Sequence, residues 1–247
     1  MRIIASDYDG TLNHGGIDDE KRTAVAEWQK KGNLFVVVTG RDKCFCPEMR
    51  EKSGIIMDYY LACNGAMILD RDFHTIKEAR IEKAVIVPLL EYLFELNCDW
   101  GNLCAEQSTR IYSPACADIP EEACFLADAE RIEFCNQIST ALPSFEEAAR
   151  VTKAVAEKFG HAVNPLQNGT CIDIVPVGMD KAQGIYRLLA SCGAKYEDVI
   201  TVGDNVNDIA MLEEFYSYAM ENGVDAVKEI ADKTTPGVTQ LIYNELQ

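Results

Sequence analysis

Residues 34–38 read Leu-Phe-Val-Val-Val, a run of five apolar residues without a polar interruption. A strand with one wet face alternates apolar and polar side chains, so an unbroken run rich in β-branched residues predicts a strand that is buried on both faces. Strands of this kind belong to parallel sheets that carry helices on both sides. The run therefore predicts an α/β fold in which further strands and helices alternate around it.

Strands and helices do alternate near both ends of the chain, which predicts one doubly wound parallel sheet. In the first part we expect strands at 2–6, 34–38, 59–62 and 67–69, and a helix from Asp18 or Asp19 to about Lys31. In the last part we expect strands at 199–202 and 216–220, and helices at 181–192, 207–214 and 224–230 and after Pro236.

The middle of the chain differs in character for almost a hundred residues. We expect helices at 84–96 and 144–159 there, and strands at 98–104, 110–112, 132–138, 161–165 and 170–175. An α+β unit of residues 82–176 is therefore predicted to be inserted between two parts of one core, residues 1–81 and 177–247.

The charge of the chain excludes several classes of partner. There are 23 Lys and Arg against 40 Asp and Glu, which gives a formal net charge of −17. A chain this acidic is repelled by nucleic-acid phosphates and by anionic membranes, and no Lys/Arg block compensates. No apolar stretch approaches the roughly 20 residues that span a bilayer. We therefore expect neither nucleic acid nor a membrane as a partner.

Ten cysteines in 247 residues are too sparse for a disulfide scaffold. We interpret them as reduced and mostly buried. The first residues contain no signal-like apolar segment, since Asp7 and Asp9 interrupt the run from Met1 to Ala5. These features predict a cytoplasmic protein.

Acidic, hydroxyl and glycine residues directly follow the predicted strands, at the edge where open parallel sheets bind ligands. These residues are Asp7-Tyr8-Asp9-Gly10-Thr11, Thr39-Gly40-Arg41 and Gly203-Asp204-Asn205-Val206-Asn207-Asp208, with Lys181 at the start of the helix between the last two. Carboxylates, a hydroxyl and a lysine make a pocket for a phosphoryl group and a divalent cation, because Mg²⁺ takes oxygen ligands. Taken singly, each acidic pair also fits a turn or a helix N-terminus.

The order of these segments resembles the haloacid dehalogenase superfamily of phosphohydrolases, in its Cof-type branch with a large α/β cap. DYDGTL (7–12) is similar to the nucleophile loop DxDGTL, and TGR (39–41) to the second motif. Lys181 stands where the third-motif lysine is expected, and GDNVNDIAML (203–212) is similar to GDxxNDxxML. Segments 64–66 and 219–222 also resemble this branch.

The resemblance implies a Mg²⁺-dependent phosphatase with an aspartyl-phosphate intermediate. Asp7 would attack phosphorus, and Asp9 would protonate the leaving alcohol and then deprotonate water. This task needs a carboxylic acid with a raised pKa, and close packing beside a second carboxylate is one way to obtain it. The Asp7 and Asp204 side chains and the Asp9 backbone carbonyl would hold Mg²⁺, with Asp208 as a further ligand or as a hydrogen-bond acceptor behind it.

The same resemblance implies which groups hold the phosphoryl oxygens. Lys181 and the Thr39 hydroxyl would do so, assisted by the backbone N–H groups of Tyr8 and Gly40. We place Arg41, Asn64 and Asn207 at the substrate as well. Alternative roles are open for two of them: Arg41 as an anchor of its loop, and Asn207 as a hydrogen-bonding partner within the acidic loop.

The insertion favours a substrate with a neutral leaving group. Residues 82–176 contain six basic and 15 acidic residues, so few cations are available for a second phosphate. We therefore expect a small phosphorylated metabolite of the sugar phosphate class as substrate, and a monomer or weak homo-oligomer. A phosphomutase or phosphotransferase of the same fold, or a non-catalytic phosphometabolite-binding protein, is the alternative.

Three features of the sequence remain open. Residues 168–170 form a turn that either contacts the substrate or is the solvated tip of a hairpin, and we expect the hairpin tip. Arg110 meets a second anionic group or, as we expect, lies at the surface. The stretch after Arg41, Asp42 to Pro47, predicts a longer loop before a delayed helix, with Pro47 in the first turn of that helix.

Overall fold

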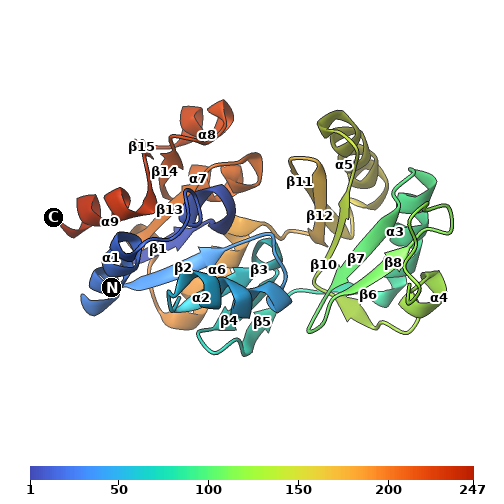
Figure 1. Ribbon diagram of the computed structural model, residues 1–247, viewed down its shortest axis with the longest axis horizontal. Helices are drawn as coiled ribbons and strands as arrows, with labels where there is room; N and C mark the ends of the chain where they lie inside the picture. Colours follow the sequence, from blue (N-terminus) through green and yellow to red (C-terminus); the bar gives the residue numbers. More distant parts are fainter.

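Leu34–Val38 forms strand β2, which lies inside an eight-stranded sheet of the computed structural model (Figure 1). The structure describes all residues, 1–247. The strand order is β15-β14-β13-β1-β2-β3-β4-β5, and β4 and β5 are the antiparallel members at one edge. Strands β1, β2 and β13 are central and parallel, so their carboxyl ends reach the same edge of the sheet.

The elements of this core lobe closely follow the expected pattern. The strands are β1 (Ile3–Ser6), β2 (Leu34–Val38), β3 (Tyr59–Ala62), β4 (Met67–Asp70), β5 (Thr75–Glu78), β13 (Val199–Gly203), β14 (Tyr216–Met220) and β15 (Lys233–Thr235). The helices are α1 (Asp19–Lys30), α2 (Cys46–Ser53), α6 (Lys181–Cys192), α7 (Ile209–Glu214), α8 (Asp225–Ile230) and α9 (Val238–Leu246).

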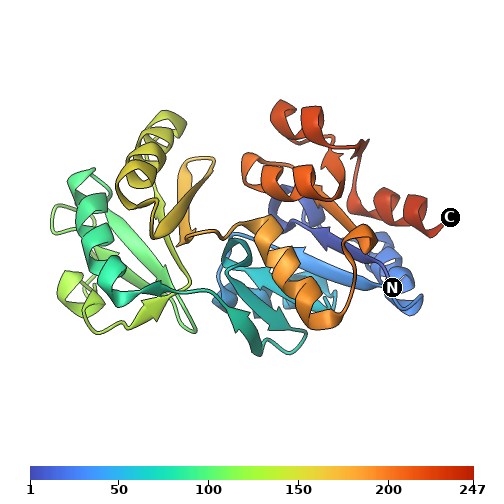
Figure 2. The ribbon, with the colours of Figure 1, turned by 180° about the vertical axis from the view of Figure 1, so that it is seen from behind.

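Both faces of the core sheet are covered, as the run at 34–38 predicts. Phe35 and Val37 pack on one face, in a cluster that includes Trp28 of α1. Val36 and Val38 pack on the other face, in a cluster that includes Leu188 of α6. Figure 2 shows α6 and α7 crossing the sheet on the side opposite to α1. Burial of alternate side chains on opposite faces therefore accounts for the absence of polar residues in β2.

Residues 82–176, called the insert from here on, fold around a second sheet. Its strands are β7 (Trp100–Cys104), β8 (Thr109–Tyr112), β10 (Gln137–Ala141), β11 (Val163–Asn168) and β12 (Cys171–Pro176), in the order β11-β12-β10-β7-β8. Its helices are α3 (Lys83–Glu95), α4 (Leu126–Ala129) and α5 (Phe145–Phe159), and β6 (Ile81–Glu82) pairs with β9 (Phe134–Cys135) at its base.

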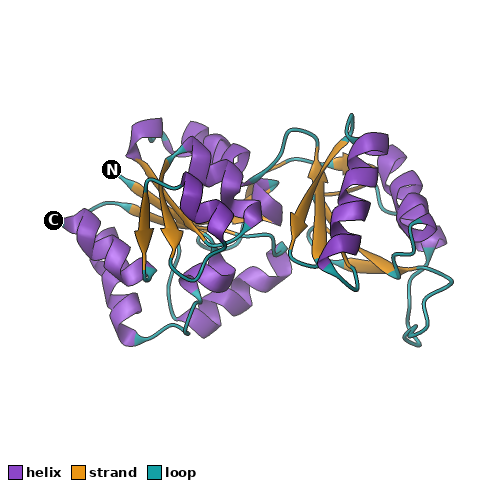
Figure 3. Cartoon of the chain, turned by 90° about the horizontal axis from the view of Figure 1, so that it is seen from above, coloured by secondary structure: helices purple, strands orange, loops and turns teal.

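The sheet of the insert is covered on one face only. Ile138, Ile172 and Ile174 pack with α3 and α5 in a separate hydrophobic cluster. The alternate residues of the same strands point to the opposite face, which is turned toward the core lobe in Figure 3. The strands of the insert therefore present a polar face to the strand ends of the core.

Some expected elements differ in detail. The single strand predicted at 132–138 is two strands, β9 and β10, which belong to different sheets. Asn136 separates them, and its side-chain N–H₂ donates to the Ala79 carbonyl at 2.8 Å. Strands β5 and β15 were not predicted, because both are short edge strands without an apolar run. Pro47 does lie in the first turn of α2, after a 3₁₀ turn at 43–45.

All ten cysteines are free thiols, and five of them are buried. The expectation that most would be buried is thus met for half of them. Among the helices there is none whose length and apolar character would suffice to span a bilayer.

Candidate active site

Asp7 stands directly after β1, and its backbone N–H donates to the Val202 carbonyl of β13 at 3.0 Å. This bond continues the parallel ladder by one residue and fixes the carboxylate at the edge of the sheet. Gly10 then turns the chain with a φ of 81°. A Cβ atom at Gly10 would lie 2.3 Å from the Asp204 carboxylate, so the glycine is required by the close approach of two loops.

Lys181 is a fully buried cation between two of the motif carboxylates. Its Nζ atom lies 2.6 Å from Asp7 Oδ1 and 2.5 Å from Asp208 Oδ1. Burial alone disfavours the ammonium, but Asp208 and Asp7 outweigh this effect and raise the pKa of Lys181. Lys181 is therefore charged at neutral pH and binds the first and last acidic motifs together.

The acidic loop after β13 is held by its own carboxylate. Asp208 Oδ2 accepts the backbone N–H groups of Asp204 at 2.9 Å and of Asn205 at 3.0 Å. The Thr11 hydroxyl donates to Asp204 Oδ1 at 2.7 Å from the opposite loop. These bonds fix Asp204 opposite Asp7, and they give Asp208 a positioning role in addition to its pairing with Lys181.

Asp7, Asp204 and Asp208 form the one cluster that meets the spacing of a metal site. One carboxylate oxygen from each lies within 4.8 Å of those of the other two. Burial raises the pKa of Asp7 to about 8, with Lys181 opposing the shift, and burial also raises the pKa of Asp204. Three carboxylates face a single ammonium, so the cluster lacks positive charge. An all-oxygen donor set with this deficit fits a hard divalent cation such as Mg²⁺.

Asp9 does not join this cluster. Both of its carboxylate oxygens accept hydrogen bonds from Arg41, at 2.6 Å from Nε and 2.8 Å from Nη2. The Arg41 guanidinium in turn lies 5.8 Å from the Tyr8 ring centroid and 5.3 Å from that of Phe45. The group beside Asp9 is thus a cation and not a second carboxylate, because Arg41 attracts the Asp9 carboxylate while the acidic cluster repels it.

A cavity of about 280 Å³ lies between these strand ends and the open face of the insert. Its volume is close to the lower end of ligand pockets, roughly 300 Å³. The core contributes the predicted residues Asp7, Asp9, Thr39, Gly40, Arg41 and Asn207, together with Asn205. The insert contributes Trp100, Ser139, Thr140, Asn168, Cys171 and Asp173.

Five predicted residues do not line the cavity. Lys181 is fully buried beneath Asp7, so the structure does not bring its ammonium to the space for phosphoryl oxygens, and Asp204 also lies off the lining. The other three lie behind the cavity. Tyr8 is buried under Arg41, and Asp208 is buried behind Lys181. Asn64 is also buried, with a φ of 50°, and its side chain points toward the insert instead of the substrate space. The prediction that Asn64 contacts substrate is replaced by a contact that ties the two lobes together.

The hydrogen-bonding partner of Asn64, Asp173, was not predicted as a site residue. Asp173 Oδ2 accepts from Asn64 Nδ2 at 3.1 Å, and Asp173 Oδ1 accepts from the Ser139 hydroxyl at 2.8 Å. Gln137 lies beside both and donates to the Gly40 carbonyl at 2.8 Å. Burial raises the pKa of Asp173, with Ser139 and Asn64 opposing the shift. An acidic residue within the otherwise apolar segment 172–175 was the available sequence signal.

The network of Asn64, Gln137 and Asp173, called the clasp from here on, places the insert against the second motif. A Cβ atom at Gly40 would lie 2.7 Å from Asp173 Oδ2. On the other side of the cavity, Asn205 Nδ2 donates to Asn168 Oδ1 at 3.2 Å. The end of β11 therefore contacts the acidic loop, and the expectation of a solvated hairpin tip is wrong for Asn168.

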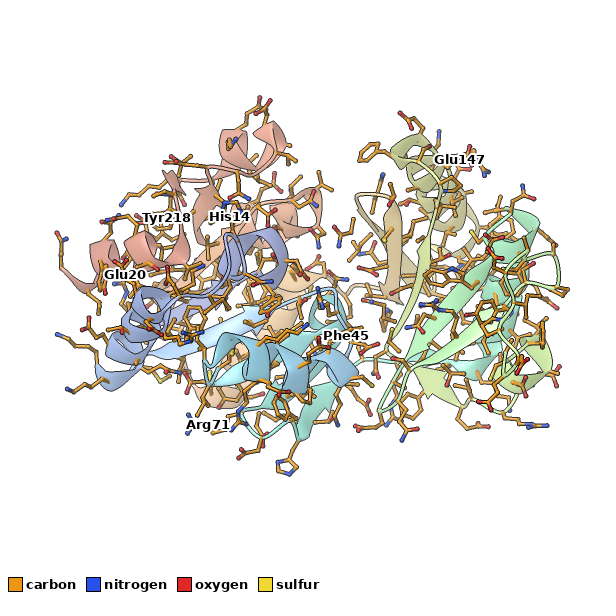
Figure 4. All side chains as sticks on the ribbon, viewed as in Figure 1. His14, Glu20, Phe45, Arg71, Glu147 and Tyr218 are labelled. Atoms are coloured by element: carbon orange, nitrogen blue, oxygen red, sulfur yellow. The ribbon has the colours of Figure 1, made fainter.

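The loop after Arg41 also meets the insert. Asp42 accepts from the Ser108 hydroxyl, and Lys43 pairs with Glu106, both of which lie on the turn between β7 and β8. In Figure 4, Phe45 lies on the side of the core lobe that faces the insert, whereas Glu147 lies on the outer helix α5. The extra residues that distinguish this loop thus provide a docking surface for the insert.

Comparison with known proteins now identifies the family. The sequence profile of the haloacid dehalogenase-like hydrolases matches residues 4–240. The chain belongs to this family. It is therefore an enzyme, a hydrolase, and the structural match extends over both lobes. A haloacid dehalogenase-like hydrolase from Bacteroides thetaiotaomicron is 21% identical with a TM-score of 0.80, and the match covers 99% of each chain.

Several relatives in this family are phosphatases. The 5-amino-6-(5-phospho-D-ribitylamino)uracil phosphatase YcsE of Bacillus subtilis (strain 168) is 28% identical over 95% of this chain and 90% of its own length. The pyridoxal phosphate phosphatase YbhA of Escherichia coli (strain K12) is 26% identical over 99% and 98%. The subclass IIB sugar phosphatase BT4131 shares the fold, with a TM-score of 0.80, 19% identity and 99% coverage of each chain.

Proposed function

We propose that this hydrolase is a Mg²⁺-dependent phosphomonoesterase that acts on a small phosphorylated metabolite of the sugar phosphate class. Residues 1–81 and 177–247 serve as the catalytic core and residues 82–176 as a cap over it. We further propose that it works in the cytoplasm as a monomer or weak homo-oligomer. The ten free thiols are in keeping with a reducing compartment.

The observation that carries this proposal is the position of Asp7. Its carboxylate lies on the cavity, in contact with the buried Lys181 ammonium, and next to Asp204. A nucleophile, a fixed cation and a set of hard oxygen ligands are the groups that phosphoryl transfer requires. Thr39 and Gly40 lie on the same cavity, where their hydroxyl and N–H groups are available to phosphoryl oxygens.

The reaction then proceeds in two displacements at phosphorus. An Asp7 carboxylate oxygen forms a bond to phosphorus while the bond to the leaving oxygen breaks, and Asp9 gives its proton to that oxygen. Water then attacks the aspartyl-phosphate, Asp9 takes the proton of the water, and inorganic phosphate leaves as Asp7 is restored. Asp9 acts in both steps only after Arg41 releases one of its carboxylate oxygens.

Asp7 and Asp204 are the side chains that we propose for the Mg²⁺ site, together with the Asp9 backbone carbonyl, and Asp208 is a further ligand or a hydrogen-bond acceptor behind them. Bound there, the ion supplies charge neutralisation between the nucleophile and the phosphate. Lys181 keeps Asp7 oriented, and Asp208 keeps the acidic loop closed around Asp204. These contacts fix the donor set before any substrate arrives, which is the preorganisation that electrostatic catalysis needs.

The cavity supports a substrate with one phosphate and a neutral leaving group. Arg41 is the one cation among the residues that line the cavity, and its guanidinium is already paired with the Asp9 carboxylate. The other residues that the insert presents are neutral, apart from Asp173, whose carboxylate is engaged by Ser139 and Asn64. The substrates in the names of the relatives YcsE and YbhA also carry one phosphate on a neutral organic group.

The test is phosphate release from para-nitrophenyl phosphate and from a panel of sugar phosphates, nucleotides and bisphosphates. We expect release with Mg²⁺ and none after chelation, with kcat/KM higher for monophosphates than for the matching bisphosphates. Asp7→Asn is expected to abolish release while the far-ultraviolet circular dichroism is unchanged. Full activity of Asp7→Asn would remove Asp7 as the nucleophile, and an isomerised product without free phosphate would indicate a mutase instead.

A further inference from the structure

Trp100 is the single aromatic residue that lines the active-site cavity. It begins β7 on the face of the insert that is turned toward the core, and its side chain is half-buried. The second tryptophan, Trp28, is fully buried in the core, where its indole N–H donates to the Leu34 carbonyl. Trp28 thus has a structural explanation, whereas the packing of the insert does not by itself explain an indole at the cavity.

The indole of Trp100 is held in place from one side. The Arg110 guanidinium carbon of β8 lies 4.1 Å from the ring centroid, a cation–π contact. The Thr140 hydroxyl donates to the Trp100 carbonyl at 2.7 Å and fixes the backbone beneath the ring. Arg110 does not line the cavity, so the ring meets the cavity on a side that Arg110 leaves uncovered. Arg110 is exposed, which confirms its expected surface placement, and it supports this indole from outside the cavity.

Most of the residues with which the insert lines the cavity are uncharged, and Asp173 is the one charged residue among them. Ser139, Thr140, Asn168 and Asn205 line the same cavity, and Cys171 is the one other apolar member. A flat apolar surface with neutral hydrogen-bonding groups at its margin suits a ring with an apolar face and a polar edge. An open-chain polyol offers no such face, because its hydroxyl groups rotate to all sides.

We propose that Trp100 is the surface on which the ring of the leaving group packs, so that ring-bearing phosphomonoesters are preferred over open-chain esters of similar composition. This inference rests on the proposed phosphatase function and adds a specificity residue to it. The ring is either a saturated sugar ring or an aromatic ring, since both present an apolar face to an indole.

Glucose 6-phosphate and sorbitol 6-phosphate are the matched probes for this proposal. They have the same number of carbon atoms and one phosphate each, and they differ in the ring. Phenyl phosphate is the aromatic probe. The measured quantity is the ratio of kcat/KM between variant and parent for each probe, which cancels the intrinsic reactivity of the ester.

We expect Trp100→Ala to lower kcat/KM about tenfold for glucose 6-phosphate or for phenyl phosphate, and less than twofold for sorbitol 6-phosphate. The probe with the larger loss identifies the kind of ring. Trp100→Phe is expected to retain most of the preference. Tyr92→Ala is the control, because Tyr92 lies on α3 of the insert, packs against Phe159 and does not line the cavity. It is expected to leave the ratios unchanged.

An equal loss for all probes in Trp100→Ala, with Trp100→Phe no better, would overturn the proposal and indicate a structural role. A parent enzyme that hydrolyses sorbitol 6-phosphate as well as the ring esters would overturn it too, and would leave the phosphatase function standing. If no phosphate is released at all, calorimetric titration of Asp7→Asn with glucose 6-phosphate and with sorbitol 6-phosphate decides. A ring preference there that Trp100→Ala removes supports the proposal without the phosphatase function, and equal affinities oppose it.

Discussion

Arg41 grips Asp9 with two parallel hydrogen bonds, Nε to Oδ2 at 2.6 Å and Nη2 to Oδ1 at 2.8 Å. This bidentate pair joins the second motif to the first, and it leaves neither oxygen of Asp9 free for a proton transfer. The side chains of both residues are about half exposed, 39% and 50%. Because solvent reaches both side chains, the pair can open without leaving either charge buried. Arg41 is thus suited to orient the Asp9 carboxylate and still to release it for proton transfer.

Arg41→Ala is expected to lower kcat/KM for para-nitrophenyl phosphate about tenfold with little change in stability, because it removes the orientation of Asp9. Asp9→Asn is expected to cost about 10²–10⁴-fold, as the loss of a general acid and base does. If Arg41 acts through Asp9, the double variant is no slower than Asp9→Asn. Steady-state kinetics of the four proteins check this, and additive losses would assign Arg41 a separate role. Arg50→Ala is the control, because Arg50 of α2 donates to the Arg71 carbonyl and does not line the cavity.

Lys181→Met is expected to destabilise the fold by about 3–5 kcal/mol, because it leaves Asp7 and Asp208 buried without their cation. Urea unfolding in the absence of metal measures the loss. Saturating Mg²⁺ is expected to recover part of it, since the ion supplies the missing positive charge. Lys153→Met is the matched control: this lysine lies on the exposed face of α5, 3.9 Å from Glu157. Its removal is expected to cost less than about 1 kcal/mol.

Mg²⁺ is expected to raise the Tm of the parent protein by several degrees, because a ligand that binds the folded state alone stabilises it by mass action. Asp204→Asn removes one of the three clustered carboxylates and is expected to abolish most of this shift. Differential scanning fluorimetry with and without Mg²⁺ measures both. Asp225→Asn, an exposed change at the start of α8, is expected to keep the full shift. An undiminished shift in Asp204→Asn would place the ion elsewhere.

Asp173 predicts a pH dependence of stability. Its pKa is raised in the folded protein by burial, from an ordinary value of 3.8. Below that value the carboxyl is protonated in both states and contributes nothing. As the pH rises above about 4, the unfolded chain ionises first, so the folded state binds more protons and loses relative stability.

Asp173→Asn removes this titration. We therefore expect the free energy of unfolding of the parent, relative to Asp173→Asn, to decrease as the pH rises from about 4 toward neutral. Urea titrations of both proteins across that range measure the difference. A difference that is constant with pH, or that changes in the opposite direction, would mean that the clasp holds Asp173 ionised without cost.

Much of this fold was predictable because the strands carry their own signals. Residues 34–38 have no polar position, and Asp18 caps α1 through the Lys21 N–H as its place before the helix predicts. Strand β15 was not predictable, because its pairing with β14 depends on the rest of the sheet and not on its own sequence, Lys-Thr-Thr. Tertiary contacts thus decide the elements whose local pattern is weak.

The site residues were predictable where their order and spacing in the sequence determine their position in the fold. The residues that follow β1, β2 and β13 converge because parallel strands end at one edge. The pairing of Asp9 with Arg41 was not predictable, because the sequence does not show which charged side chain lies next to the Asp9 carboxylate in the folded protein. The same holds for Asn64 and Asp173, which are 109 positions apart in the sequence and meet across the two lobes.

The clasp restricts which inserts from related enzymes can replace residues 82–176 of this chain. Gln137 and Asp173 come from the insert, whereas Asn64 and Gly40 come from the core, and each half leaves buried polar groups unpaired without the other. A chimera that receives a foreign insert therefore inherits specificity only together with the residues at these four positions. Recombination at the lobe boundary alone would produce a protein in which both lobes fold but the hydrogen bonds between them are not formed.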